Sequence, residues 1–177
     1  MKVAILTSSR ADFGIFEPLI DELIIDDTIE LELIAFGTHL SIFHGYTINN
    51  IRSKYNVIIH QINSLLLNDN EVSIASSYGI TLLKFADFWS LNNYDLVFCL
   101  GDRYEMSAAV QAGIPFGVNF AHLHGGETTL GATDNIYRHQ ISLASNLHFT
   151  STNKFKSRVA DLIESEKNIF NVGSLSI

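Results

Sequence analysis

Two clusters of polar residues, each directly after an apolar run, hold most of the side chains in this sequence that could do chemistry. The first cluster is Gly101-Asp102-Arg103, which follows the apolar run Leu96–Leu100. The second lies between Ala121 and His139, in AHLHGGETTLGATDNIYRH, and follows the apolar run Gly117–Ala121. Carboxylates, imidazoles and guanidinium groups can move protons and bind anions. Packing alone does not account for both clusters, so the sequence predicts a functional site.

Asp102 and Glu127 are the candidate pair for acid–base chemistry. Two carboxylates in different surroundings can take different pKa values, so that one acts as an acid and the other as a base. Glu127 follows Gly125 and Gly126, which would let the backbone approach a ligand. Asp102 has an alternative role as a helix N-cap, because aspartate is common at that position.

Asp134 and Arg138 are four residues apart at the start of a predicted helix. Taken by themselves, they favour a structural role, in which Asp134 caps the helix and forms an i,i+4 ion pair with Arg138.

Arg10 and Arg103 are candidate phosphate ligands. Arg10 follows the first predicted strand and precedes a helix, where a guanidinium group and free backbone amides suit a phosphate. The alternative for Arg10 is a surface arginine that pairs with Asp12. The sequence contains neither GxGxxG nor GxxxxGK[ST], so it has no dinucleotide fingerprint and no P-loop.

The histidines do not predict a metal site. His122 and His124 alternate along the chain and would point to opposite sides of a continuing strand. His139 on a helix is a poor third ligand, so we expect no metal. We interpret His148, in the sixth predicted strand, as a core or edge histidine with its hydrogen bonds satisfied.

Short apolar runs alternate with longer segments whose apolar residues recur every three or four positions. This alternation predicts an α/β fold, a parallel Rossmann-like three-layer sandwich. Ligands of such sheets bind beyond the carboxyl ends of the strands, where Arg10, His39, Asp102 and Glu127 all fall. The predicted strands are Val3–Thr7, Leu31–Ala35, Val57–Ile62, Leu96–Leu100, Gly117–Ala121, Leu147–Thr150 and Ile169–Val172. The predicted helices are Phe16–Ile25, with Pro18 in its first turn, Val72–Leu91, Glu105–Ala112, Asn135–Ala144 and Lys154–Ile163.

The composition is that of one globular domain. The chain has 177 residues, of which 47% are hydrophobic and 17% charged. The net charge of −8 argues against nucleic acid or an anionic membrane surface as the main partner. No apolar run is long enough to span a membrane, and the N-terminus reads as a strand rather than a signal peptide. The single cysteine, Cys99, lies in an apolar run as a core residue, so we expect a reducing, cytoplasmic location.

Six segments together resemble a known enzyme family. They are TSSRADFG (Thr7–Gly14), FGTHL (Phe36–Leu40), LGDRYE (Leu100–Glu105), HLHGGETTLGATDNIYRH (His122–His139), LHFTST (Leu147–Thr152) and NVGSLSI (Asn171–Ile177). As a set they resemble the hydrolysing nucleotide-sugar 2-epimerases of bacterial sialic-acid pathways, above all the hydrolysing UDP-N-acetylglucosamine 2-epimerases. A sister group acts on UDP-N,N'-diacetylbacillosamine in legionaminic-acid synthesis.

The resemblance implies a two-domain fold like that of the B-type glycosyltransferases, with the site in the cleft between the domains. Residues 1–177 would form the N-terminal Rossmann-like domain, and the C-terminal nucleotide-binding domain of the family would be absent from this chain. The family reaction eliminates UDP across carbons 1 and 2 to give a glycal, which is then hydrated with inversion at carbon 2 to N-acetylmannosamine. The resemblance implies a UDP-sugar substrate, no metal or redox cofactor, and a homodimer or homotetramer.

The resemblance also implies roles for individual residues. Asp102, Glu127 and Asp134 match acidic positions tied to proton transfer and substrate positioning, with Asp102 the first choice of base and Glu127 the second. At the position of His124, some relatives, including the animal enzyme, have glutamate, whereas the bacterial sialic-acid branch commonly has histidine. The candidates for binding the nucleotide sugar are Arg10, His39, Arg103, His124, Gly125, Gly126 and Arg138.

Two other functions stay open from the sequence. A glycosyltransferase of similar fold would transfer the sugar to an acceptor, and a non-catalytic module would only bind the nucleotide sugar. UDP-N-acetylglucosamine and its 4-acetamido-4,6-dideoxy analogue differ at carbons 4 and 6, and the candidates to read those positions are Thr128, Thr129 and Leu130, by nearness to Glu127. We interpret Val72–Leu91 as a buried helix, with an oligomer interface as the alternative.

Overall fold

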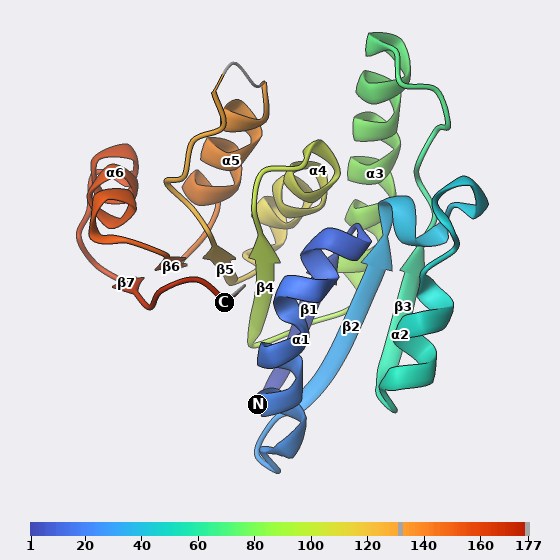
Figure 1. The fold of residues 1–177 in the computed structure, drawn as a ribbon, viewed down its shortest axis with the longest axis horizontal. Helices are drawn as coiled ribbons and strands as arrows, with labels where there is room; N and C mark the ends of the chain where they lie inside the picture. Colours follow the sequence, from blue (N-terminus) through green and yellow to red (C-terminus); the bar gives the residue numbers. More distant parts are fainter. Residues whose placement is uncertain (131–132, 176–177) are drawn as a thin grey trace.

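Parallel strands form one sheet with helices on both faces (Figure 1). The computed structural model describes residues 1–130 and 133–175; Gly131, Ala132, Ser176 and Ile177, which belong to the motif segments above, lie outside the described residues. The strand order is β3-β2-β1-β4-β5-β6-β7, which confirms the predicted Rossmann-like α/β fold. The strands are β1 (Lys2–Thr7), β2 (Glu30–Phe36), β3 (Ile58–Ile62), β4 (Leu96–Leu100), β5 (Phe120–Leu123), β6 (Leu147–Thr150) and β7 (Ile169–Asn171).

The helices cover the two faces of the sheet with separate hydrophobic clusters. On one face, Phe16 and Ile20 of α1 and Ile48 of α2 pack against the sheet. On the other face, α3, α4 and α5 bury residues such as Phe85 and Met106. The helices are α1 (Arg10–Ile25), α2 (Ile48–Lys54), α3 (Glu71–Leu91), α4 (Tyr104–Gly113), α5 (Asp134–Leu143) and α6 (Asn153–Ile163), with short 3-10 helices η1 (Gly37–Leu40), η2 (Ile42–His44) and η3 (Ile114–Phe116).

The predicted starts of α1 and β5 were wrong by more than one residue. The helix α1 begins at Arg10 rather than Phe16, because Ser9 and Asp12 form a capping box at its start. Pro18 therefore lies inside the helix and not in its first turn. The strand β5 begins at Phe120 rather than Gly117, because η3 ends on Gly117 in the left-handed conformation (φ 65°). His122 consequently lies within the strand and not in the loop after it.

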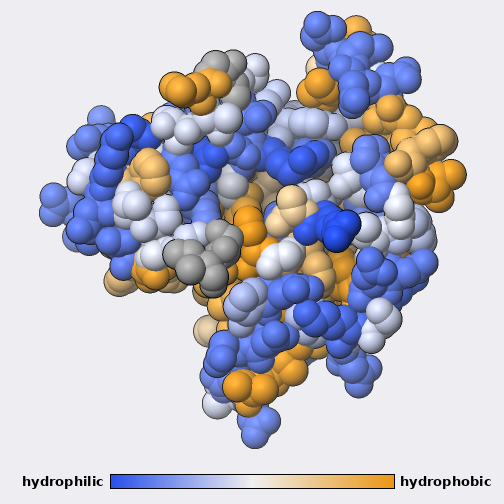
Figure 2. Space-filling view, viewed as in Figure 1, coloured by the Kyte–Doolittle hydropathy of each residue, from blue (hydrophilic) through white to orange (hydrophobic). Residues whose placement is uncertain are grey.

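The parallel direction of the strands brings the loops that follow them to one edge of the sheet. That edge carries the turns after β1, β4, β5 and β6, as expected from the sequence. Figure 2 shows polar side chains over much of one face, with apolar side chains gathered at its right-hand end near η2. Ile42 and Phe43 of η2 are 74% and 72% exposed there. Among the described residues, no helix is both long and apolar enough to cross a membrane.

Candidate active site

The turn after β4 presents Asp102 at the carboxyl edge of the sheet. Gly101 turns the chain with φ 77°, in the left-handed region that favours glycine, and its N–H donates to the carbonyl of Leu123 in β5 (3.1 Å). Helix α4 starts two residues after Asp102, and its N-cap is Arg103, without a side-chain hydrogen bond. Asp102 therefore does not cap the helix, and its carboxylate is free to contact a residue outside α4.

That residue is Arg138, which lies between the two candidate acids. Its Nη2 donates to Oδ2 of Asp102, and its Nη1 donates to the carbonyl of His124 (2.8 Å). The same Nη1 lies 3.8 Å from Oε2 of Glu127. Arg138 is only 5% exposed, so its charge acts on both carboxylates with little screening by water. One buried guanidinium group thus holds two carboxylates from two different loops.

The expected pair of Asp134 with Arg138 is not formed among the described residues, because Arg138 turns toward Asp102 and Glu127. Asp134 is exposed in the first turn of α5, whose N-cap is Thr133. It lines a separate pocket of about 560 Å³ together with Tyr104 and Tyr137. The structure therefore joins Asp102 and Glu127 through Arg138, while Asp134 lies at a neighbouring pocket.

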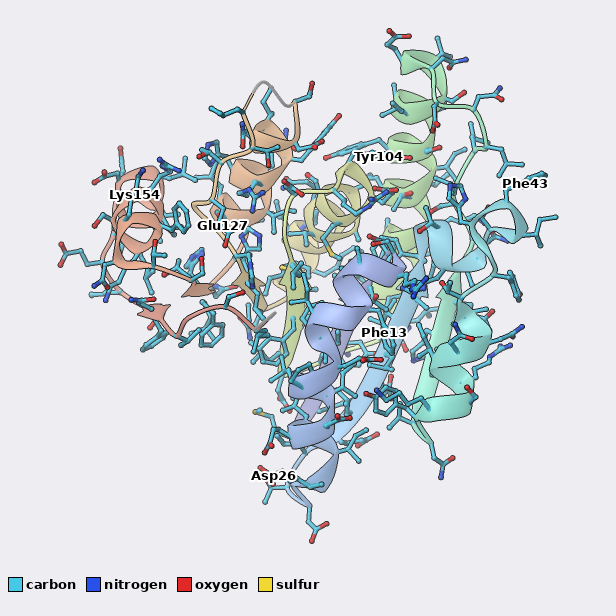
Figure 3. The ribbon with its side chains drawn as sticks, viewed as in Figure 1. Phe13, Asp26, Phe43, Tyr104, Glu127 and Lys154 are labelled. Atoms are coloured by element: carbon cyan, nitrogen blue, oxygen red, sulfur yellow. The ribbon has the colours of Figure 1, made fainter. Side chains whose placement is uncertain are left out.

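Glu127, which is labelled in Figure 3, contacts Ser151, His124 and Arg138. Its Oε1 accepts from the Oγ of Ser151 (2.7 Å) and lies 3.1 Å from Nδ1 of His124. These contacts lower the pKa of Glu127, first through the hydrogen bond from His124, then through that from Ser151 and the charge of Arg138, against burial, which raises it. Glu127 is therefore ionised at neutral pH in this domain and is better suited to accept a proton than to donate one.

The loop that carries Glu127 has an unusual backbone. His124 has φ 63° and Gly126 has φ 78°, both in the left-handed region. A Cβ on Gly126 would lie 2.4 Å from the carbonyl oxygen of Phe155, and one on Gly125 would lie 3.0 Å from the Oγ of Ser142. Close packing of this loop against the protein itself therefore explains both glycines.

The loop before α1 is organised around Asp12. Its carboxylate accepts from the backbone N–H groups of Ser8 (2.8 Å) and Ser9 (2.9 Å) and from the hydroxyls of Ser8 and Thr7. Asp12 therefore serves the backbone, and the alternative in which it pairs with Arg10 is wrong among the described residues. The sequence signal was present, because Ser9 and Asp12 have the spacing of a capping box.

Arg10 and His39 flank this loop in different ways. Arg10 is exposed and lines a pocket of about 280 Å³ beside α2. His39 is fully buried, with Nε2 2.8 Å from the Oγ1 of Thr7 and Nδ1 2.7 Å from the Oγ1 of Thr47. Burial lowers the pKa of His39, against the opposing effect of Asp12. Both ring nitrogens of His39 are thus occupied by the protein, whereas the exposed guanidinium group of Arg10 has no ion-pair partner among the residues that the structure describes.

Arg103 lies with Asp102 in a pocket of about 230 Å³ between the start of α1 and the end of β4. Its Nη2 pairs with Oε1 of Glu105 at 2.9 Å, and its side chain is 43% exposed. Glu105 itself is 1% exposed, so this ion pair ties Arg103 to a buried carboxylate. The pocket therefore places a guanidinium group next to the Asp102 carboxylate.

The histidines of the region are not arranged as metal ligands. Within residues 1–130 and 133–175, no group of three or more His, Cys, Asp or Glu side chains is placed to hold a metal ion. His122 bonds Ser142 and Gly101 instead. His148 is 1% exposed, and in the described part of the chain neither of its ring nitrogens has a hydrogen-bond partner, so the expectation of a satisfied histidine was wrong.

The sequence reasoning did not consider Ser151, and it considered His122 only as a metal ligand. Ser151 directly follows β6, so the rule that places polar residues after strands at the carboxyl edge could have found it. His122 lies inside a strand, where no such rule applies.

These features define an α/β domain with an acid–arginine cluster at the carboxyl edge of a parallel sheet. The family model described as UDP-N-acetylglucosamine 2-epimerase matches residues 21–177, and the chain belongs to this family. The GDP/UDP-N,N'-diacetylbacillosamine 2-epimerase (hydrolyzing) of Campylobacter jejuni is 38% identical over 99% of this chain. The polysialic acid biosynthesis protein P7 of Escherichia coli is 37% identical over 98% of it.

Solved structures of similar fold carry related names. A crystal structure of a UDP-N-acetylglucosamine 2-epimerase covers 100% of this chain with a TM-score of 0.84 and 18% identity. The UDP-GlcNAc 2-epimerase of Neisseria meningitidis, bound to UDP-GlcNAc, covers 98% with a TM-score of 0.82 and 19% identity. This chain spans 45% of the Campylobacter relative and 44% of the Escherichia coli relative, so it corresponds to about half of those proteins.

Proposed function

We propose that the protein acts as a hydrolysing 2-epimerase of a UDP-sugar, in the first instance UDP-N-acetylglucosamine. The observation that carries the proposal is the cluster in which Arg138 joins the carboxylates of Asp102 and Glu127 at the carboxyl edge of the sheet. Membership of the 2-epimerase family supports it, as do relatives with hydrolysing activity in their names.

The reaction needs two stages. In the first, a base removes the proton from carbon 2 while the bond between carbon 1 and the phosphate oxygen breaks, which gives a glycal and UDP. In the second, water adds across the double bond: hydroxyl bonds to carbon 1, and a proton returns to carbon 2 from the opposite face. The product is N-acetylmannosamine. An ionised carboxylate is required for the first proton, and cationic groups are required near the departing phosphate.

The residues of this chain can be assigned to these steps. Asp102 is the proposed base, and Arg138 holds its carboxylate in one orientation. Arg10 and Arg103, both with accessible guanidinium groups, are the proposed ligands of the phosphates. Glu127, with its lowered pKa, stays ionised and is the second candidate for a proton-accepting role. Asp134 is proposed to position the sugar from the neighbouring pocket.

We propose that the active unit also contains a second, nucleotide-binding domain. The named relatives are about twice as long as this chain, and the phosphate ligands proposed here lie on one edge of a single domain. Residues 1–177 alone are therefore expected to be inactive, so kinetic experiments require the two-domain protein. A homodimer or homotetramer in the cytoplasm is part of the same proposal. Helix α3 has an exposed apolar side that could form the interface, with Val72, Leu83 and Leu91 75%, 65% and 83% exposed, whereas its Phe85 and Trp89 are buried in the core.

UDP-N,N'-diacetylbacillosamine is the second candidate substrate. Relatives from Campylobacter jejuni and Legionella pneumophila, 38% and 36% identical to this chain, are named for that sugar nucleotide. It carries an acetamido group at carbon 4 and a methyl group at carbon 6, where UDP-N-acetylglucosamine has hydroxyls.

The test is to incubate the two-domain protein with each sugar nucleotide and to identify the products by NMR. We expect release of UDP and a 2-epimerised free sugar without any acceptor. Asp102→Asn should abolish this turnover while the protein still binds UDP. Sugar transfer that requires an acceptor would support a glycosyltransferase, and unchanged turnover of Asp102→Asn would refute the catalytic assignment.

A further inference from the structure

We propose that His122, a buried residue that does not contact the substrate, is a positioning residue for Asp102. It would hold the Gly101–Asp102 turn against helix α5, and so keep the proposed base in register with Arg138. The inference rests on the proposed role of Asp102 in catalysis. His122 begins one of the motif segments, but it lies within strand β5 and outside the acid–arginine cluster.

Two hydrogen bonds connect His122 to the two sides of the site. Its Nε2 lies 2.9 Å from the carbonyl oxygen of Gly101, the residue before Asp102. Its Nδ1 lies 2.9 Å from the Oγ of Ser142 in α5. Because a carbonyl oxygen can only accept, Nε2 must carry the proton, and Nδ1 must then accept from the hydroxyl of Ser142. The neutral ring therefore has one defined tautomer and one defined orientation.

The turn that His122 holds is built around Gly101. Gly101 adopts φ 77°, and its two backbone polar groups are both bonded to β5: the N–H to the carbonyl of Leu123 and the carbonyl to His122. Glycine is the most flexible residue, so these two bonds, together with the ion pair between Asp102 and Arg138, restrict the conformation of the turn. Loss of the bond from His122 would free the peptide that leads directly into Asp102.

The second bond links this turn to the helix of Arg138. Ser142 is four residues after Arg138, and residues at this spacing lie on the same face of a helix. Arg138 and Ser142 are both buried on that face, at 5% and 0% exposure. His122 thus spans from the helix that carries the arginine to the turn that carries the carboxylate, and it fixes the distance over which Asp102 and Arg138 meet.

The ring stays neutral over the working range of pH. Burial lowers the pKa of His122 to about 3, with smaller contributions from the charges of His148, Arg138 and His124 and an opposing effect of the hydrogen bond to Gly101. On a charged ring both nitrogens would be donors, so the bond with Ser142 would have to reverse its direction. The two hydrogen bonds of His122 are therefore a permanent part of the site and do not act as a pH switch.

His148 offers a matched control. It lies beside His122 in the sheet, as its register partner on β6, and is equally buried at 1% exposure. Within residues 1–130 and 133–175, neither of its ring nitrogens has a hydrogen-bond partner, so no such bond connects it to the Asp102 turn. A purely structural effect of removing a buried histidine should appear in both positions.

The experiment compares His122→Leu, His122→Gln, Ser142→Ala and His148→Leu in the two-domain protein, with Asp102→Asn as the reference. We expect His122→Leu to lower kcat about 100-fold with little change in KM, since a misplacement of about 1 Å can cost that much. His122→Gln, whose amide can donate to the Gly101 carbonyl, should recover most of kcat. Ser142→Ala should lower kcat less than His122→Leu, and His148→Leu should leave kcat unchanged.

Hydrogen–deuterium exchange provides a readout that is independent of turnover. The peptide containing Gly101 and Asp102 should exchange faster in His122→Leu than in His148→Leu. Equal kinetics and equal exchange in these two variants would overturn the positioning role, even with Asp102→Asn inactive. An active Asp102→Asn would instead refute the proposed catalytic role of Asp102, and unchanged exchange of the turn in His122→Leu would refute the positioning role separately.

Discussion

Replacement of Arg138 by methionine tests the centre of the site. The change removes the guanidinium group but keeps a side chain of similar length. It leaves the carbonyl of His124 without its donor and the carboxylates of Asp102 and Glu127 without a shared cation. Breaking a buried ion pair costs about 3 to 5 kcal/mol of unfolding free energy. The carboxylate side chains are 23% and 28% exposed, so water compensates in part, and we expect the lower end, about 3 kcal/mol.

The measurement is urea and thermal unfolding of the 177-residue chain at pH 7.5, monitored by circular dichroism. For a domain of this size, 3 kcal/mol corresponds to a fall in Tm of about 6 to 12 °C. Arg158→Met is the control, because Arg158 donates to the carbonyl of Gly126 (2.6 Å) in the same loop but pairs with no carboxylate among the described residues. Its loss should cost about 1 kcal/mol.

The pH dependence sharpens the test. The pKa of Glu127 is lowered in the folded protein, by the hydrogen bond from His124 first and in part by Arg138. The stability that such a carboxylate contributes is present above its ordinary pKa of 4.5 and is lost as the pH falls through the folded value. The difference in unfolding free energy between wild type and Arg138→Met should therefore be largest above pH 4.5 and decrease as the pH falls below that value. Arg138 does not have this central role if Arg138→Met lowers the unfolding free energy no more than Arg158→Met does. The same holds if the difference in unfolding free energy between wild type and Arg138→Met is equal at pH 3.5 and 7.5.

Three further predictions concern the surroundings of the site. His148→Leu should raise the unfolding free energy by about 1 kcal/mol at pH 7.5, because it removes two unsatisfied buried nitrogens. Burial lowers the pKa of His148 from 6.5 to about 4, so the unfolded chain takes up the proton first as the pH falls. The wild type should therefore lose unfolding free energy between these pH values, and urea unfolding at pH 7.5 and 4.5 should show a smaller loss of unfolding free energy in the variant. Gly126→Ala should destabilise the chain by about 2 kcal/mol or more, whereas Gly14→Ala in α1, where a Cβ would meet nothing within 4 Å, should not; equal Tm values of the two variants would contradict this. Cys99 is fully buried, which raises its pKa to about 12, so a thiol reagent should label it only after unfolding, and labelling of the folded chain at a rate near that of a free thiol would count against the core assignment.

The sequence predicted the fold because its signals are local and strong. The strands Leu96–Leu100 and Leu147–Thr150 have the predicted bounds, since each is a short apolar run between polar residues. The edge of the sheet that carries the site also followed from the sequence, because parallel strands all end on the same side. The start of β5 did not follow, because Gly117 looks like the start of an apolar run but ends a 3-10 helix.

The contacts inside the site could not be predicted in the same way. Asp134 and Arg138 have the spacing of an ion pair along a helix, yet Arg138 turns to Asp102, which lies 36 residues earlier in the chain. Two carboxylates within reach of one buried guanidinium group outweigh one exposed carboxylate on the same helix, because burial strengthens the interaction between charges. Only the folded chain places those carboxylates there.

The sequence by itself thus determined the sheet, the order of its elements, the family and the set of residues at one edge. The tertiary structure decided which of these residues touch: Arg138 with Asp102 and Glu127, Asp12 with its own loop, and His122 with the turn after β4. The physical reason is range. Apolar periodicity and capping act over a few residues and can be read along the chain, whereas hydrogen bonds and ion pairs between loops depend on distances that packing alone sets.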